Sequence, residues 1–195
     1  MRDAIINRKT NETEIDIYLN IDGTGKNEID TGIGFFDHLL ILFCSYAKFD
    51  IKLKAKGDLY VDCHHTVEDI GICLGEVLKN ALKEKSYINR YGFFLLPMDE
   101  TLVLSSLDLC NRSYLNFDAS FTSENIGEMP TELFIEFFRA FTNHANFTLH
   151  IKNLSNNFNN HHLAEAIFKS VGKSLLLATS IDKTNSLVPS TKGVI

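Results

Sequence analysis

Two histidine-rich motifs, HHTVE at 64–68 and HHLAE at 161–165, have the residue types of a divalent-metal site. They stand 97 positions apart (161 − 64 = 97), close to half of the 195-residue chain. If each motif opens a helix, its first histidine and its glutamate lie at i and i+4 on one face, where both can bind one ion. The second histidine is rotated by about 100° around the helix and points elsewhere. Each motif therefore offers ligands in two directions.

The repetition predicts two metal sites that exchange ligands about a pseudo-twofold axis. Their ligands would be His64, Glu68 and His162 in one site, and His161, Glu165 and His65 in the other. A single motif of this kind is better explained as a capped helix start with exposed polar residues. Its recurrence at the equivalent place in a second repeat favours metal ligands instead.

Two further histidines stand where they could complete these ligand shells. His38 lies in GFFDHLL, and His150 is a polar residue within the alternating segment FTLHI. Taken alone, either would be read as a core histidine with satisfied hydrogen bonds, and His144 is assigned to the surface. Imidazole and carboxylate ligands without thiolate suit Mn²⁺, Fe²⁺ or Zn²⁺ and leave open positions for a substrate.

The segments that must position these residues are also repeated. Each half begins with alternating strands, continues with an amphipathic helix and a further strand, and ends with a helix opened by the motif. The expected strands cover 4–10, 14–22, 49–55, 91–99, 101–109, 113–120 and 147–153. The first helix of each half is expected at 35–47 and 133–145, and the second runs on to 84 and 180.

This order of elements predicts an α+β fold. We expect an internally duplicated two-layer unit, in which each half is a small sheet covered on one face by two helices. The repeats would span about 1–88 and 89–185, followed by a C-terminal tail at 186–195. Because no long linker separates them, the repeats are expected to form a single catalytic domain.

The composition excludes some classes of partner. A net charge of −6 and the lack of any block of lysine and arginine argue against nucleic acid. No apolar run is long enough to span a bilayer, and the N-terminus lacks a signal-peptide pattern, so no membrane partner and a cytoplasmic location are expected. The four cysteines have no Cys-x-x-Cys spacing and are expected to be reduced and mostly buried.

The motifs together resemble one enzyme family. DCHHTVEDIG, GIGFFDHLL, IDGTG, PMDETLVLSSLDL, TLHI, NNHHLAEAIFK and PSTKG occur in the order found in imidazoleglycerol-phosphate dehydratase of histidine biosynthesis. The similarity runs from about Arg8 to Gly193, and the duplicated His-His-x-x-Glu motif is highly specific to that family. The resemblance implies a manganese-dependent lyase that converts imidazoleglycerol phosphate to imidazoleacetol phosphate by way of a metal-bound imidazolate, with two Mn²⁺ per active site.

The resemblance also implies roles for individual residues. The metal ligands would be His38, His64, Glu68 and His162 in one site, and His65, His150, His161 and Glu165 in the other. Glu12, Glu68 and Glu165 would take part in catalysis. The phosphorylated imidazole substrate would be bound by Glu12, Arg90, Arg112, Ser190, Thr191 and Lys192.

The family assembly would be a homo-oligomer of twenty-four subunits with metal sites completed across interfaces. The sequence departs from the family pattern at three places. Tyr46 replaces a histidine, Ile41 replaces an acidic residue, and Asn111 replaces a glycine before Arg112. The first two changes put in doubt any substrate contact from that helix, whereas asparagine tolerates the left-handed backbone of a turn.

Two other functions use the same residues. A dinuclear metallohydrolase would activate water between the ions and cleave a small phosphate ester. A metal-storage protein would need the histidines and glutamates but would have no use for Arg90, Arg112 and Lys192.

Overall fold

The computed structural model describes residues 1–83, 87–156, 159–182 and 189–190. The first repeat consists of β1 (Asp3–Lys9), β2 (Thr13–Asn20), β3 (Asn27–Asp30), α1 (Gly34–Ala47), β4 (Asp50–Gly57) and α2 (His64–Ala81). The second repeat consists of β5 (Tyr91–Met98), β6 (Thr101–Asp108), β7 (Tyr114–Asp118), α3 (Leu133–Ala145), β10 (Thr148–Asn153) and α4 (Asn160–Thr179). A short hairpin, β8 (Asn125–Ile126) and β9 (Met129–Pro130), is inserted between β7 and α3.

The two sheets have the same topology, which confirms the predicted duplication. The strand orders are β1-β2-β4-β3 and β5-β6-β10-β7. In both sheets the first three strands in this order pair antiparallel with their neighbours. The last pair, β4 with β3 and β10 with β7, is parallel. The predicted strands and helices are present at nearly the expected positions. Strand β3 and the β8–β9 hairpin were not predicted.

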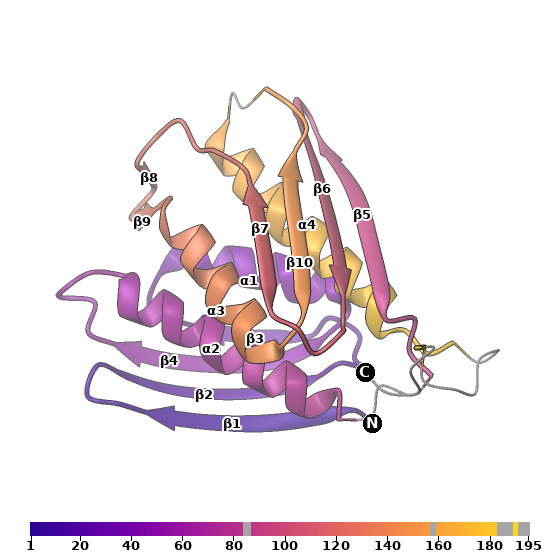
Figure 1. Ribbon diagram of the computed structural model, residues 1–195. Helices are drawn as coiled ribbons and strands as arrows, with labels where there is room; N and C mark the ends of the chain where they lie inside the picture. Colours follow the sequence, from indigo (N-terminus) through magenta and orange to yellow (C-terminus); the bar gives the residue numbers. More distant parts are fainter. Residues whose placement is uncertain (84–86, 157–158, 183–188, 191–195) are drawn as a thin grey trace.

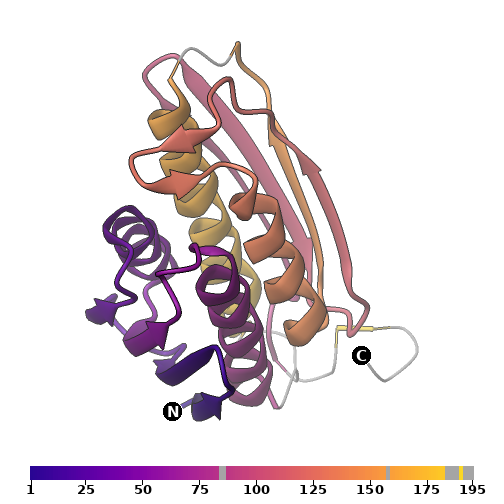
Figure 2. The ribbon, with the colours of Figure 1, turned by 90° about the vertical axis from the view of Figure 1, so that its left-hand side faces the viewer.

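The repeats pack helix against helix, so that the molecule has four layers. Helices α1 and α2 cover the first sheet, and α3 and α4 cover the second (Figures 1 and 2). Across the middle, α1 packs against α4 and α2 packs against α3. The predicted fold class is therefore confirmed: α+β, with each sheet covered on one face by two helices.

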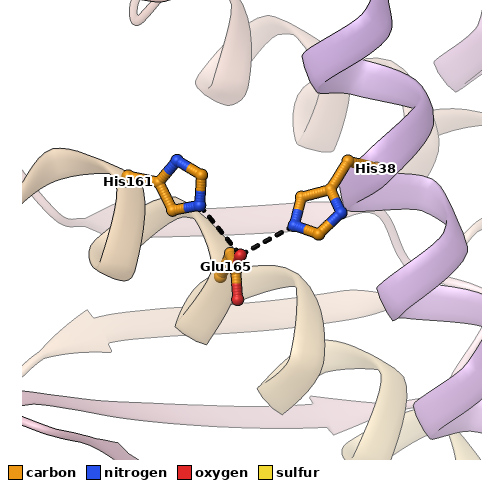
Figure 3. Close-up of side chains that lie close together, drawn as sticks. All are labelled: His38, His161 and Glu165. Carbon is orange, nitrogen blue, oxygen red and sulfur yellow. Dashed lines mark hydrogen bonds and ion pairs between the residues drawn. The ribbon is translucent and has the colours of Figure 1, made fainter.

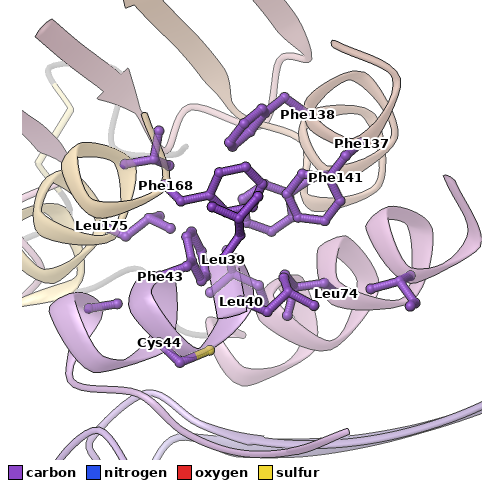
Figure 4. Packing of buried hydrophobic residues seen from close by; sticks show 14 of the residues in the cluster. Leu39, Leu40, Phe43, Cys44, Leu74, Phe137, Phe138, Phe141, Phe168 and Leu175 are labelled. Carbon is purple, nitrogen blue, oxygen red and sulfur yellow. The ribbon is translucent and has the colours of Figure 1, made fainter. Parts of the chain in front are cut away.

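The packing between the helical layers depends on aromatic rings and on glycine. Between the layers, the rings of Phe43 on α1 and Phe141 on α3 meet edge-on at 5.9 Å (Figure 4). Phe36 on α1 likewise meets Phe137 on α3 edge-on at 5.3 Å, and Phe137 stacks on Phe168 of α4 at 5.4 Å. At Gly172 of α4, an added Cβ would lie 2.5 Å from the Phe43 carbonyl oxygen of α1. The lack of a side chain at this position therefore permits the close approach of α1 and α4.

Two other predictions concern the C-terminal tail and membrane-spanning segments. Of the predicted tail at 186–195, only Pro189 and Ser190 are among the described residues. Within the described helices, no segment combines the length and apolar character needed to cross a membrane.

Candidate metal centre

Both motifs open helices, for local reasons that can be seen at each helix start. Helix α2 begins at His64, whose backbone N–H donates to the Asp62 carboxylate at 2.7 Å. Helix α4 is capped by Asn159, whose side-chain oxygen accepts from the backbone N–H groups of His161 and His162. An asparagine or aspartate at this place satisfies donors that the helix itself cannot. The first histidine and the glutamate of each motif are consequently one helical turn apart.

Three of the predicted ligands converge although they come from both halves of the chain. The Nε2 atom of His38 lies 2.7 Å from Glu165 Oε1, and the Nε2 atom of His161 lies 2.9 Å from the same oxygen (Figure 3). The ligand atoms of the three residues all lie within 4.8 Å of one another. His38 reaches this place because α1 packs along α4.

A lysine completes the surroundings of Glu165. The ammonium of Lys169, one turn further along α4, donates to Glu165 Oε2 at 2.5 Å. Burial opposes ionisation of Glu165, but hydrogen bonds from His38, Lys169 and His161 outweigh it and lower the pKa of this carboxyl to about 2. Glu165 is thus an anion at neutral pH, as a metal ligand must be.

The adjacent histidines of each motif diverge, as predicted. The ring planes of His64 and His65 are inclined by 80°, and those of His161 and His162 by 77°. His64 Nε2 is 3.9 Å from Glu68 Oε2, while the neighbouring His65 faces Asp58. The hydrogen bond to Asp58 raises the pKa of His65.

The second histidine of the other motif also faces carboxylates. Nδ1 of His162 lies 3.1 Å from Glu100 Oε2 and 4.0 Å from Asp99 Oδ2. These three residues form a second group whose ligand atoms are within 4.8 Å of one another. The pKa of Glu100 is lowered by its own backbone N–H and by the hydrogen bond with His162.

One predicted grouping is not formed within a single chain. His38 was expected with His64, Glu68 and His162, but it contacts Glu165 and His161 instead. The reason is the helix packing, since His38 is on α1, which packs against α4, whereas His64 and Glu68 are on α2, which packs against α3.

The predicted ligand His150 lies on the other side of the second sheet. Its neighbours on β10, Leu149 and Ile151, are buried under the helices, whereas His150 is exposed and its ring lies 5.6 Å from that of Tyr114. Alternation along a strand places neighbours on opposite faces. His150 therefore belongs to the outer face of its sheet and is separated from His161 within the chain.

Glu12 is brought to the first motif by a buried polar contact. It follows β1 in the turn to β2, and its Oε1 lies 3.9 Å from His65 Nε2. Asp69, which follows Glu68 in α2, accepts a hydrogen bond from Thr13 at 2.5 Å and pairs with Arg8 Nη1 at 2.5 Å. The β1–β2 hairpin is thereby held against the start of α2.

The predicted phosphate-binding residues are only partly described. Nε and Nη2 of Arg90 donate to the Asp108 carboxylate at 2.7 and 3.1 Å, and Nη1 donates to the Pro189 carbonyl at 2.7 Å. Ser190 is thus the residue that directly follows the carbonyl group bound by Arg90.

Arg112 is exposed and follows Asn111, whose φ of 58° is the left-handed conformation expected there. Thr191 and Lys192 lie outside the described residues.

Sequence reasoning missed several residues that contact the motifs. Lys169 could have been found, because it stands at i+4 from Glu165 on the same helix face. Asp58 and Glu100 come from loops, and no periodicity connects them with the histidines that they contact. Tyr46, flagged as a departure from the family pattern, has its ring 5.9 Å from Lys169 Nζ and 5.5 Å from Lys173 Nζ.

The donor set fits a borderline divalent ion. His38, His161 and Glu165 supply two imidazole nitrogens and one carboxylate oxygen, and these three leave positions open for further ligands. The carboxylate is ionised and the imidazoles can present a lone pair once the ion replaces their hydrogen bonds to Glu165. The arrangement suits a site where a metal and a substrate meet.

Comparison with known proteins identifies the family. The family model described as imidazoleglycerol-phosphate dehydratase matches residues 31–175. The imidazoleglycerol-phosphate dehydratase of Lachnoclostridium phytofermentans is 55% identical over 194 residues, covering 100% of this chain and 98% of that protein. The chain belongs to the imidazoleglycerol-phosphate dehydratase family. It is accordingly a hydro-lyase of histidine biosynthesis.

Other members of the imidazoleglycerol-phosphate dehydratase family agree in length and structure. The Clostridioides difficile enzyme is 50% identical and is covered completely, as is this chain. The crystal structure of the Staphylococcus aureus enzyme superposes with a TM-score of 0.83 at 37% identity, covering 92% of this chain and 99% of that one. The Pyrococcus furiosus enzyme, solved in complex with (S)-C348, gives 0.84 at 38% identity over 97% of this chain and 100% of that one.

Proposed function

We propose that this chain dehydrates imidazoleglycerol phosphate to imidazoleacetol phosphate in the cytoplasm, using two Mn²⁺ ions per active site. The observation that carries the proposal is the convergence of His38, His161 and Glu165, which come from the two repeats of a chain in this family. A non-catalytic metal store would have no need of the two buried or half-buried cationic partners found here, Lys169 at Glu165 and Arg90 beside Pro189.

The two ions would be held by the eight histidines and glutamates that the motifs and their neighbours provide. His38, His161 and Glu165 would supply one set of ligands, and His64 with Glu68 would begin the other. The second histidines, His65 and His162, and His150 would complete these shells. When bound, the ions supply Lewis acidity to the imidazole ring of the substrate.

The chain's own residues would move the protons. Glu12 is the candidate acid and base, because its carboxylate lies 3.9 Å from His65 Nε2 and therefore at the edge of the predicted metal site. Glu68 and Glu165 would act as metal ligands. Their negative charges would also stabilise nearby groups in the protonated form. The Arg8–Asp69–Thr13 contacts would keep Glu12 at a fixed distance from the first motif.

Arginines and the C-terminal residues would bind the phosphate. Arg90 uses three of its five N–H donors on Asp108 and Pro189, which leaves two for a phosphate oxygen. Arg112 is exposed and free of burial costs. Ser190, Thr191 and Lys192 are proposed to close the phosphate site from the C-terminal side.

The active site would be completed between subunits of a homo-oligomer, proposed to contain twenty-four copies. His150 can serve a metal only from the outer face of its sheet, away from the motifs of its own chain. The same face carries large exposed apolar side chains on β5, with Tyr91, Phe93 and Leu95 exposed by 56%, 65% and 48%. A surface of this kind is typical of an interface.

Product analysis distinguishes this function from the alternatives. The purified protein with Mn²⁺ should release imidazoleacetol phosphate from imidazoleglycerol phosphate, and stripping the metal with a chelator should abolish the product. Release of inorganic phosphate without imidazoleacetol phosphate would identify a metallohydrolase and overturn the proposal. Binding of Mn²⁺ with neither product would identify a storage protein.

A further inference from the structure

The second histidine of each motif makes the same kind of contact in both repeats. Nδ1 of His65 lies 3.3 and 3.0 Å from the two carboxylate oxygens of Asp58. Nδ1 of His162 lies 3.2 and 3.1 Å from the two carboxylate oxygens of Glu100. In each case the carboxylate comes from outside the motif and from outside its helix.

The two carboxylates are supplied by different parts of the fold. Asp58 follows β4 in the loop that leads to α2, and its side chain is 12% exposed. Glu100 lies in the tight turn between β5 and β6, and its side chain is 31% exposed. The second repeat has no acidic residue at the corresponding place, which is Ser155 when counted from the motif and Asn156 when counted from the preceding strand. The two repeats have therefore reached the same histidine contact with different residues.

This contact determines which ring nitrogen is left for a ligand. An ionised carboxylate can only accept a hydrogen bond, so Nδ1 of each histidine must carry the proton. In a neutral imidazole, the other nitrogen, Nε2, then has the free lone pair that a metal needs. The first histidines differ, since His161 directs its Nε2 atom to Glu165 and His64 directs its own toward Glu68.

The position of Glu12 agrees with this assignment. Its Oε1 lies 3.9 Å from Nε2 of His65, the nitrogen left free by Asp58. The candidate acid and base is thus next to the atom at which a metal would be bound. In the second repeat, Asp99 is 4.0 Å from Nδ1 of His162 and so lies on the side of Glu100.

We propose that Asp58 and Glu100 are positioning residues that hold His65 and His162 as Nδ1–H tautomers and present their Nε2 atoms to the two metal ions. This inference rests on the proposed function, because it requires that the motifs bind metal. Removing a carboxylate that hydrogen-bonds a metal-bound histidine typically lowers the metal affinity by about 10- to 100-fold.

Metal affinity in the full-length protein tests the inference without using activity. Metal-stripped wild type and the variants Asp58→Ala and Glu100→Ala are titrated with Mn²⁺, and unbound Mn²⁺ is followed by its EPR signal. Each alanine variant should weaken Mn²⁺ binding about 10- to 100-fold. Glu28→Gln is the matched control, because Glu28 forms an exposed ion pair with Lys52 on the first sheet and should leave the affinity unchanged.

Conservative variants separate positioning from a general loss of stability. The amide oxygen in Asp58→Asn and Glu100→Gln can still accept the Nδ1 proton, but without charge, so their affinities should fall between those of wild type and alanine. If an alanine variant does not fold, the amide variants still test the inference. Affinities within twofold of wild type in the alanine or amide variants of both residues would overturn this inference but not the proposed function. A wild type that binds no Mn²⁺ would overturn the proposed function as well.

Discussion

His38 and Glu165 are 127 positions apart in sequence, yet His38 Nε2 lies 2.7 Å from Glu165 Oε1. The contact joins helix α1 of the first repeat to helix α4 of the second. It exists because the two helical layers pack α1 on α4, with Gly172 allowing the backbones to approach closely. This candidate metal site is thus formed by the contact between the repeats. Substitutions at that contact should therefore change the metal affinity.

Replacing His38 by alanine should weaken metal binding. The variant loses one of three converging donors, so we expect at least a tenfold lower Mn²⁺ affinity in isothermal titration calorimetry. His144→Ala is a suitable control, because His144 hydrogen-bonds only to the Ala140 carbonyl of its own helix among the contacts described for it. Equal affinity in His38→Ala and wild type would show that His38 is not a ligand.

Glutamine at the two motif glutamates should have unequal effects on the metal-free protein. Glu165→Gln leaves the half-buried Lys169 ammonium without its anion, so we expect a loss of about 1–3 kcal/mol in the free energy of unfolding. Glu68 is only partly buried and lies 3.9 Å from His64, so Glu68→Gln should change the free energy of unfolding by less than about 0.5 kcal/mol. Both variants should lose Mn²⁺ and fail to assemble. Urea unfolding and size-exclusion chromatography measure these effects, and unchanged metal content in both would contradict the ligand assignment.

The helix starts and the duplication could be predicted because their causes are local. Motif spacing, the Asn159 cap and the alternation of β2, β4, β6 and β10 are all readable within a few residues. Strand β3 was missed because four residues between a glycine-rich turn and a helix carry too little alternation to be recognised. The β8–β9 hairpin has strands of two residues, which no periodicity can reveal.

The grouping of the site residues could be predicted only in part. Residues at i and i+4, such as His161 and Glu165, follow from helix geometry. The partner of His38 depends on which helices pack together, and the pseudo-twofold symmetry of the motifs says nothing about α1. Asp58 and Glu100 depend on the paths of two loops, which are set by tertiary contacts.

Acid should destabilise the metal-free protein through Glu165. Its pKa is about 2 in the folded chain against 4.5 for an ordinary glutamate, so the ionised group stabilises the fold above pH 4.5. This contribution, on the order of 3 kcal/mol, is lost as the pH falls from 4.5 to 2 and the carboxyl takes up a proton. The free energy of unfolding, measured by urea titration at several pH values, should therefore fall less steeply over this range in Glu165→Gln than in wild type. Parallel curves for the two proteins would contradict the assignment.

Alanine at Gly172 should damage the fold and the metal site together. The new Cβ would lie 2.5 Å from the Phe43 carbonyl oxygen and 3.2 Å from the Ala47 backbone nitrogen, and backbone atoms cannot move aside as a flexible side chain can. Helix α4 must then shift away from α1, at a cost of about 1–3 kcal/mol in the free energy of unfolding. Because His38 is on α1 and Glu165 is on α4, the same shift should lengthen their contact and lower the Mn²⁺ affinity.

A second glycine provides the control for this experiment. An added Cβ at Gly34, the first residue of α1, meets no atom within 4 Å. Gly34→Ala should therefore leave the stability and the Mn²⁺ affinity close to those of wild type, although it also adds one methyl group to the same pair of helices. Urea unfolding and calorimetric Mn²⁺ titration of both variants measure the two effects side by side. A Gly172→Ala protein that is destabilised but binds Mn²⁺ as wild type does would separate the packing of α1 on α4 from the geometry of the site.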